Sequence, residues 1–420
     1  MSHDVPASLH LFEGYGVELE YMIVDRETLN VFPLAEELID HVAGKGASEW
    51  NPPVGPVAWS NELAMHVIEI KSNGPSPSLY GLAKSFQEHV NKITDLLEAH
   101  SATLLSSGMH PWMDPLTQTI LWPHEQNNIY LAYDRIFGCR GHGWSNLQSN
   151  HINLSFHGDD EFMRLHAAVR AVLPLIPALA ASSPAVDGVL TGIADTRLEV
   201  YRKNQPGVRL AIGDVIPEDV GSIPEYHERV LRPMYEEIAP LDPDGVLQQE
   251  WLNSHGAIAR FERMAIEIRL VDIQESPLAD IALTALISET VRALTEERWG
   301  SIETLRSLKT KSLADLLFRT IVTAENTPVS EPALLNLLGW NVDRIPRAGE
   351  LWSHLAEQLI DPDTARQEGW QQFYDLYREA GTLSSRVSLA ASRDGKIELQ
   401  RVYHKIAHAL QEGGLFRDGS

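Results

Sequence analysis

Three short stretches of this chain alternate between apolar and polar residues, and this alternation limits the folds that it can adopt. Val17–Val24, His151–Phe156 and Ala265–Asp272 each place aliphatic or aromatic side chains on one face and mostly polar ones on the other. This is the pattern of a half-buried β-strand. Strands of a parallel sheet covered on both faces are apolar almost throughout. We therefore predict an α+β fold with a mostly antiparallel sheet, helices on its apolar face and the polar face open.

Helical patterns separate these strands and dominate the end of the chain. Apolar residues at three- and four-residue spacing from Leu79 to Leu97 predict one helix, and Pro277 to about Arg298 predicts another. Leu63–Ile70 is expected to form a further strand of the sheet. From about Ile302 onward the pattern is mostly helical.

The composition narrows the classes of partner. The chain has 34 Lys and Arg against 58 Asp and Glu, a formal net charge of −24. This acid excess argues against general nucleic-acid binding and against docking on anionic lipid, both of which need basic side chains.

Other features indicate the compartment. Cys139 is the one cysteine, which excludes an intrachain disulfide framework and a multi-cysteine zinc site. Met1–His10 lacks the pattern of a signal peptide, and the apolar stretch Ala167–Ala185 is interrupted by Arg170 and by prolines. We expect a soluble cytoplasmic protein without membrane or nucleic-acid partners.

The polar sides of the predicted strands carry an unusual set of residues. Carboxylates dominate where a solvated sheet face usually carries Thr, Lys, Ser and mixed charges. The set comprises Glu18, Glu20, Glu69, His151, Asn153, Glu267 and Arg269. Carboxylates this close repel one another unless a cation or a proton intervenes. Mg²⁺ or Mn²⁺ is the simplest such cation, because both prefer carboxylate oxygen and tolerate an occasional imidazole.

Each of these residues also has an ordinary structural interpretation. A Glu-x-Glu pair such as Glu18 and Glu20 is more often part of a solvated strand, and a lone His151 is more often a hydrogen-bonded structural residue. Glu267 and Arg269 could form a surface ion pair that contributes little to stability. The metal-site interpretation therefore requires that these strands be neighbours in the sheet.

Six short motifs follow one another between about residues 12 and 275. The first three are Gly16–Tyr21, Asn61–Ile70 and Gly108–Pro111, and the fourth is Gln148 with His151–Ser155. The fifth combines Ala181–Pro184, Asp187–Gly188, Thr191–Gly192 and Arg197, and the sixth is Ala265–Arg269 followed by Asp272. In this order they resemble the motifs of the glutamate–cysteine ligase superfamily, which includes the bacterial carboxylate–amine ligases and is related in fold to glutamine synthetase. The resemblance implies a funnel-shaped, glutamine synthetase-like sheet. It also implies a catalytic core over residues 1–300, with a helical part over 301–420 packed on the same domain.

The resemblance also implies roles for individual residues. Two or three Mg²⁺ ions would be held by Glu18, Glu20, Glu62, Glu69, His151 and Glu267. Arg197 and Arg269 would face phosphate or a substrate carboxylate, and Asn153 would join them at the nucleotide. Glu62 lies seven residues before Glu69, so an unbroken strand would point the two side chains to opposite faces. A bulge or a late strand start is required between them.

The resemblance implies an ATP- and Mg²⁺-dependent ligase that joins an amino-acid carboxylate to an amine through an acyl phosphate. The γ-carboxylate of glutamate is one candidate for that carboxylate. The partners would be small-molecule substrates, and self-association is left open. His151–Ile152–Asn153 departs from the His-x-His usual in the carboxylate–amine ligase branch, which leaves the two substrates open. Two rivals remain: a metal-dependent amidohydrolase using the same acids with His110 or His151, and a non-catalytic regulator that binds an amino acid or a nucleotide.

Overall fold

An eight-stranded antiparallel sheet lies at the centre of the computed structural model, which describes residues 9–125, 127–392 and 398–418. Its strands run in the order β2-β3-β4-β1-β6-β10-β9, and β5 pairs with the Met22–Asp25 end of β1. The bounds are β1 Tyr15–Asp25, β2 Glu49–Trp50, β3 Val57–Asn61, β4 Val67–Ser72, β5 Ala102–Leu105, β6 Ser149–Ser155, β9 Ala257–Arg260 and β10 Ala265–Asp272. A separate hairpin joins β7 (Ala185–Val186) to β8 (Val189–Leu190). The predicted α+β class is confirmed.

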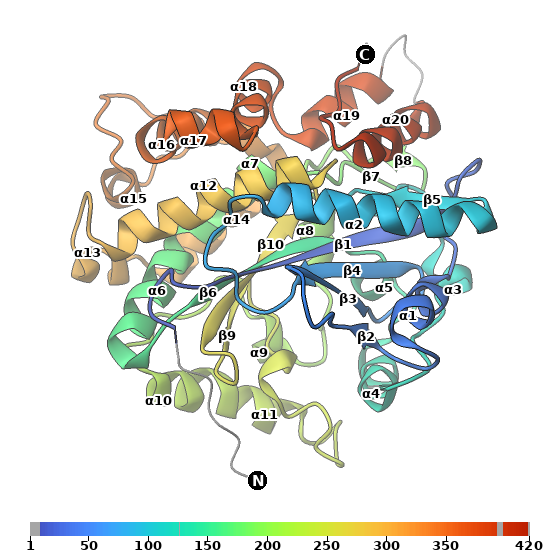
Figure 1. The fold of residues 1–420 in the computed structure, drawn as a ribbon. Helices are drawn as coiled ribbons and strands as arrows, with labels where there is room; N and C mark the ends of the chain where they lie inside the picture. Colours follow the sequence, from blue (N-terminus) through green and yellow to red (C-terminus); the bar gives the residue numbers. More distant parts are fainter. Residues whose placement is uncertain (1–8, 126, 393–397, 419–420) are drawn as a thin grey trace.

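Long helices cover the apolar face of this sheet. In Figure 1, α2 (Leu82–Leu97) and α12 (Pro277–Thr295) lie along it, and α6 (Gly158–Val172) packs against α12. The aliphatic positions of the alternating strands, such as Leu19 and Ile268, are fully buried in one core with Phe86 of α2. Burial of this apolar face is the main favourable term that holds the sheet and helices together.

Within the described residues, one helical stretch is long and apolar enough to cross a membrane by length and composition alone. It runs from Gly158 to Ala180 through α6, the 3₁₀ turn η2 (Leu173–Leu175) and α7 (Ile176–Ala180). In the fold, most of this stretch is buried, and it contacts α12 and β10. Packing of this stretch in the core accounts for its apolar composition.

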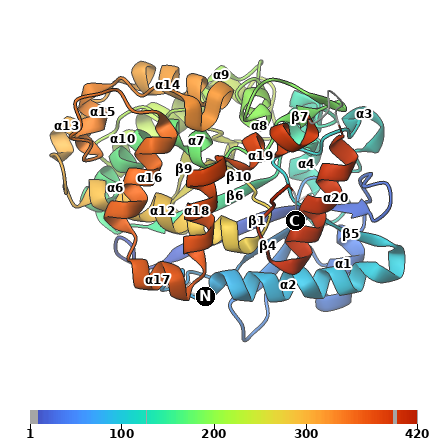
Figure 2. The ribbon, with the colours of Figure 1, turned by 90° about the horizontal axis from the view of Figure 1, so that it is seen from above.

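The C-terminal helices surround the layer of α2 and α12: α16 and α18 pack on α12, α14 packs on η2 and α7, and α20 lies against α2 and β5 (Figures 1 and 2). They are α13 Ile302–Arg306, α14 Thr310–Thr323, α15 Pro332–Leu337, α16 Ala348–Leu359, α17 Pro362–Gln367, α18 Trp370–Ala380, α19 Leu383–Ala391 and α20 Leu399–Glu412. Trp352 of α16 donates a hydrogen bond to the carbonyl of Leu175 (2.8 Å), and Tyr374 of α18 donates one to that of Ala282 (2.8 Å). The boundary at residue 300 stays a prediction.

The polar face of the sheet is covered rather than open. One end of that face, at Met22 and Val24, forms a second core with Val387 of α19 and Tyr403 of α20. The short helices of the described chain between β1 and α12 are α1 Ala35–Ala43, α3 Pro115–Gln118, α4 Asn127–Phe137, α5 His142–Ser145, α8 Thr196–Tyr201, α9 Arg209–Ile212, α10 Ile223–Tyr226 and α11 Arg232–Ile238. Of these, α1 contacts β2 and β3, and α10 contacts α6. Side chains of α4, α5 and α8 face the sheet across a cavity. The expectation of an open face was therefore wrong, and the polar residues line a cavity.

The strand expected over residues 63–70 is also placed differently. Two strands, β3 and β4, pair as a hairpin with Asn61 opposite Ile68, and residues 62–66 connect them. The Pro- and Gly-rich run at residues 52–56 hides the start of β3 in the sequence. Glu62 consequently follows the end of β3 and is not on the same strand as Glu69. The seven-residue spacing therefore does not force the two side chains to opposite faces.

Gly16 leaves room in the sheet for the side chain of Asn153, which does not itself line the cavity. It stands opposite Asn153 in the pairing of β1 with β6. A Cβ added at Gly16 would lie 2.9 Å from Cβ of Asn153. Asn153 Nδ2 donates to Glu18 Oε1 (3.1 Å), so crowding here also disturbs a carboxylate of the cavity.

We predict that Gly16→Ala lowers the free energy of unfolding by about 1–3 kcal/mol, the range typical of overpacking. Urea unfolding at constant m-value measures the change. Gly207→Ala is the matched control, because a Cβ added there meets nothing within 4 Å. Equal effects of the two substitutions would contradict the proposed crowding.

Candidate active site

The register of the sheet brings the predicted acidic residues into one place. Glu18 of β1 stands opposite His151 of β6 on one side and Lys71 of β4 on the other. Glu20 stands directly opposite Glu69. Residues directly opposite on paired strands have Cβ atoms about 4.5–5.5 Å apart. The strands that the metal-site interpretation required to be neighbours are therefore neighbours.

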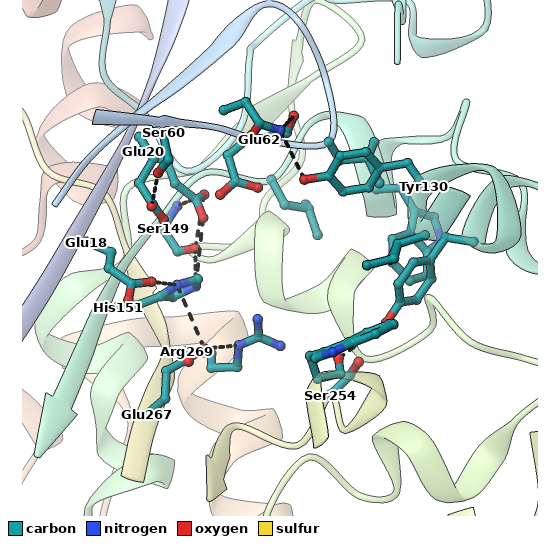
Figure 3. A pocket seen from close by; sticks show the side chains of 18 of the residues that line it. Glu18, Glu20, Ser60, Glu62, Tyr130, Ser149, His151, Ser254, Glu267 and Arg269 are labelled. Atoms are coloured by element: carbon teal, nitrogen blue, oxygen red, sulfur yellow. Dashed lines mark hydrogen bonds and ion pairs between the residues drawn. The ribbon is translucent and has the colours of Figure 1, made fainter. Parts of the chain in front are cut away.

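Two groups of side chains have the geometry of a cation site. Ligand atoms of Glu18, Glu69 and His151 lie within 4.8 Å of one another, and so do those of Glu20, Glu62 and Glu69. Glu69 belongs to both groups and lies between them. Figure 3 shows Glu18, Glu20 and His151 on one wall of the cavity, with Glu62 projecting toward them from above.

Glu18 and His151 form an ion pair within the first group. His151 Nδ1 lies 3.2 Å from Glu18 Oε2, and Arg263 Nη1 lies 3.5 Å from Glu18 Oε1. Burial opposes the charged form of Glu18, but His151 and the nearby cations outweigh it and lower the pKa of Glu18 to about 2. Burial also opposes the charged form of His151, and the neighbouring glutamates outweigh it and raise the pKa of the imidazole. The raised pKa favours the protonated imidazole, whose charge is opposite to that of the acidic wall.

Hydroxyl and amide donors orient the other two strand carboxylates. Ser149 donates its backbone N–H (2.7 Å) and its hydroxyl (3.1 Å) to Glu20 Oε2. Ser60 donates its hydroxyl to Glu69 Oε1 (2.5 Å), and Lys71 Nζ lies 3.3 Å from the same oxygen. Burial raises the pKa of Glu69, and the Glu18 charge adds to the effect. These donors hold one oxygen of each carboxylate. The other oxygen of each faces the neighbouring side chains of the cluster.

Glu62 is the most strongly destabilised acid of the cluster. It has no hydrogen-bond donor of its own among the described contacts. Burial, followed by the charges of Glu20, Glu69 and Glu18, raises its pKa well above the usual range. A group in this position binds a proton or a cation.

Glu267 lies beside the two groups and is held by arginines. Arg269 Nε lies 2.8 Å from Glu267 Oε1, and Arg260 Nη1 donates to Glu267 Oε2 (2.8 Å). His151 Nδ1 is 4.0 Å from Glu267. Both oxygens of Glu267 are engaged by these cations, and its role as a metal ligand stays a prediction. The guanidinium of Arg269 projects into the cavity between the acidic wall and the opposite wall (Figure 3).

Arg197 is arranged differently from Arg269. Its side chain is only 2% exposed, and Nε lies 2.9 Å from Oδ1 of the fully buried Asp272. Nη2 donates to the carbonyls of Arg269 (2.9 Å) and Val271 (3.0 Å). Arg197 reaches the edge of the cavity, but its polar atoms are directed to β10. Its predicted contact with phosphate or substrate stays a prediction.

The cavity measures about 630 Å³ and has an aromatic wall opposite the acidic one. This wall, which we name the aromatic wall, consists of Tyr130, Tyr133, Trp144, Tyr201 and Trp251. Tyr130 is seen there in Figure 3, where its hydroxyl accepts a hydrogen bond from Asn61 Nδ2 (3.1 Å). The volume and the two unlike walls suit a small polar molecule with a ring system.

Several cavity residues escaped the sequence interpretation. Lys71 is two residues after Glu69 on the same strand, so the alternation could have placed it on the polar face. Arg260 and Arg263 come from the β9–β10 hairpin, whose first strand is only four residues long. The residues of the aromatic wall come from helices and loops, and no strand or helix periodicity marks them.

His110 does not line the cavity. It is fully buried, and its Nε2 lies 2.7 Å from the carbonyl oxygen of Leu29. Burial lowers the pKa of His110 to about 4. A hydrolase using His110 is therefore incompatible with the structure, whereas His151 does line the cavity.

The donor set fits a hard divalent cation. Four carboxylates and one imidazole are available from the two groups, and Mg²⁺ and Mn²⁺ accept such oxygen-rich sets. The crowding of Glu20, Glu62 and Glu69 supplies the physical need for a positive charge at this point.

Comparison with known proteins identifies the family. The sequence model of the glutamate–cysteine ligase family 2 matches residues 15–319. An uncharacterized protein of Archaeoglobus fulgidus is 39% identical over 282 residues, covering 67% of this chain and 75% of that protein. The chain therefore belongs to the glutamate–cysteine ligase family 2.

More distant proteins extend this picture. A protein of Rubrobacter xylanophilus named "Putative glutamate–cysteine ligase 2-3" is 27% identical over 186 residues, which cover 44% of this chain and 47% of that one. The match thus spans about half the length of that relative. The crystal structure of a glutamate–cysteine ligase from Francisella tularensis, in complex with AMP, superposes with a TM-score of 0.55 at 12% identity, covering 98% of this chain and 90% of that one. The two proteins share their fold.

We predict that Glu62→Gln weakens Mn²⁺ binding by at least about tenfold, because it removes one oxygen ligand and one negative charge. Wild-type affinity should rise as the pH rises toward the raised pKa of Glu62, since the proton must leave before the carboxylate can coordinate. Titration with Mn²⁺, followed by electron paramagnetic resonance, measures both effects.

Glu262→Gln is the matched control for charge removal. Glu262 also lines the cavity, but it is exposed and pairs with Arg260 (2.9 Å) outside the two groups. Its loss should leave Mn²⁺ affinity within about twofold of wild type. Equal weakening by both substitutions would mean that net charge, not coordination, attracts the ion.

Proposed function

We propose that this protein is an ATP- and Mg²⁺-dependent ligase that joins an amino-acid carboxylate, such as the γ-carboxylate of glutamate, to an amine. The observation that carries the proposal is the convergence of Glu18, Glu69 and His151 in a cavity into which Arg269 projects. Membership of the glutamate–cysteine ligase family 2 supports this reaction class, and a fold relative crystallised with AMP supports a nucleotide substrate. We further propose that the protein acts in the cytoplasm on small-molecule substrates.

The proposed reaction has two displacement steps. A carboxylate oxygen of the amino acid attacks the γ-phosphorus of ATP, and ADP leaves, which forms an acyl phosphate. The nitrogen of the amine then attacks the acyl carbon, phosphate leaves, and the nitrogen loses a proton to give the amide. Such chemistry depends on positioning and on neutralising charge more than on a covalent nucleophile.

The residues of the cavity suit these requirements. Glu18, Glu20, Glu62, Glu69 and His151 would hold Mg²⁺, with Glu267 beside them. The bound ion would neutralise and clamp the oxygens of the transferring phosphate. Arg269 would stabilise negative charge on that phosphate, because its guanidinium reaches the open cavity and is held by Glu267. Asn153 orients Glu18. The aromatic wall would exclude water and offer a surface on which a nucleobase can stack.

The two rival functions make different demands. An amidohydrolase with the same acids would turn over without nucleotide and would rely on His151. A regulator of the same fold would bind nucleotide without turnover. The crowding of Glu20, Glu62 and Glu69 favours a catalytic ion site over a regulator, because such a cluster is costly to fold without a bound cation.

We predict amine-dependent phosphate release from Mg·ATP when pairs of amino acids and amines are screened. Glu18→Gln should reduce that release by about a hundredfold or more, since it removes a carboxylate at the predicted ion site. Glu262→Gln should retain most of the activity. Cleavage of an amide substrate without ATP would establish the hydrolase chemistry instead, and nucleotide binding without turnover would establish the regulator.

We predict that Arg269→Lys lowers kcat by about a hundredfold or more while the protein stays folded, because a lysine cannot reproduce the planar fork that faces the phosphate. Steady-state kinetics together with the thermal midpoint measure this change. If KM rose and kcat did not change, Arg269 would instead contact a part of the substrate that is bound equally well in the ground state and in the transition state.

A further inference from the structure

Strand β10 contains a bulge at the residue that reaches the cavity. Ile268 pairs with Ile152 and Val271 pairs with Asn150, so β10 has two residues, Arg269 and Leu270, where β6 has only His151. Such a bulge redirects a side chain and is often found beside active sites. Closing it would shift the register by one residue and exchange the faces of all residues beyond it.

The guanidinium of Arg197 binds the bulge from outside the sheet. Nη2 donates to the carbonyls on both sides of Leu270, those of Arg269 (2.9 Å) and Val271 (3.0 Å). The amide of Arg269 donates in turn to the carbonyl of Gly256 (2.9 Å). The main chain on either side of the bulged residue therefore has hydrogen-bond partners that depend on Arg197.

Asp272 anchors Arg197 in this position. Its carboxylate is fully buried and lies 2.9 Å from Arg197 Nε. Its other oxygen accepts hydrogen bonds from the backbone N–H of Ser182 (2.9 Å) and the hydroxyl of Ser183 (2.7 Å). Ser183 Oγ also accepts from the backbone N–H of Arg197 (3.1 Å).

Gly108 completes the surroundings of Asp272. Its N–H donates to the hydroxyl of Ser182 (2.9 Å), and a Cβ added to it would lie 2.5 Å from Cγ of Asp272. Three of the family-like motifs, which lie far apart along the chain, therefore meet around one buried carboxylate. We name this network the β10 lock; it consists of Gly108, Ser182, Ser183, Arg197 and Asp272.

We propose that the β10 lock is a positioning device: Arg197, held by Asp272, keeps the β10 bulge in place and so directs Arg269 into the cavity. Arg197 is on this account a positioning residue and does not contact substrate. The inference deepens the proposed function and rests on it for its kinetic consequences. Its structural consequence, the maintenance of the bulge, is independent of any substrate.

Arg197→Lys tests the lock. A lysine retains the positive charge beside Asp272 but cannot bind the carboxylate and both carbonyls at once. Arg170→Lys is the matched control: Arg170 is equally buried and donates to the carbonyl of Pro217 (2.7 Å), but it does not line the cavity. Thermal midpoints of both variants establish that they fold.

The first measurement is hydrogen–deuterium exchange of the protein without substrates. In Arg197→Lys we expect exchange at least tenfold faster in residues 268–272 and in the facing residues 149–152. Arg170→Lys should leave these two segments unchanged. Unchanged exchange of these segments in Arg197→Lys would overturn the proposal whether or not the protein proves to be a ligase.

The second measurement is a double-mutant cycle on amine-dependent phosphate release. We expect Arg197→Lys to lower kcat at least tenfold with KM changed less than threefold, and to lower it less than twofold when Arg269→Lys is already present. If Arg197→Lys lowered kcat equally in the wild-type and Arg269→Lys proteins, or mainly raised KM, Arg197 would act on the substrate directly. Either result would overturn the positioning role. A wild-type protein without ATP-dependent turnover would refute the proposed function, and the exchange result would still decide the lock.

Discussion

Antiparallel pairing of β1 between β4 and β6 is the constraint on which the rest of this structure depends. The pairing places Glu20 against Glu69, at a separation where like charges repel, and Glu18 against His151, with which it forms an ion pair. The apolar face of the same strands is fully buried against the helices, and this burial holds the register. A shift by one residue would bury the carboxylates in the core. The acidic wall and the hydrophobic core are thus two faces of one set of strands, and neither can form without the other.

The repulsion within the acidic wall is relieved unevenly. Glu18 has His151 and Arg263 beside it, Glu267 has two arginines, and Glu20 accepts hydrogen bonds from Ser149. Glu62 lacks such a partner among the described contacts, and its carboxyl is the one whose neutral form is most favoured. This unevenness locates the point at which a divalent cation would lower the electrostatic free energy most.

The family motifs divide into two sets by their place in the structure. Those on β1, β4, β6 and the start of β10 present side chains to the cavity. Those around Gly108, Ser182 and Asp272 lie beneath it, buried, and bind one another and the backbone of β10. A motif match by itself does not distinguish these two cases, because both kinds of residue are polar and occur in short distinctive runs.

Much of the fold was predictable from the chain itself. Local alternation and helical spacing identified β1, β6, β10, α2 and α12, because burial of one face imposes its period on the sequence. The expected strand over 63–70 was displaced, since a hairpin preceded by prolines and glycines has too short a pattern to read. The covering of the polar face was not predicted. It involves short helices far apart in the sequence, and the apolar pattern of each helix shows which of its residues are buried but not which part of the fold it packs against.

The sequence by itself determined which residues could form an acidic site, because strand alternation decides which side chains share a face. Only the tertiary structure decided that they meet. Strand order brings β4, β1 and β6 side by side, and the end of β3 at Asn61 turns Glu62 into the cavity. Tertiary structure also placed Tyr130 opposite the acids, His110 outside the cavity, and Arg197 against the backbone of β10. The physical reason is that hydrogen bonds and ion pairs act over a few ångströms in space, whereas periodicity records only whether each residue is buried.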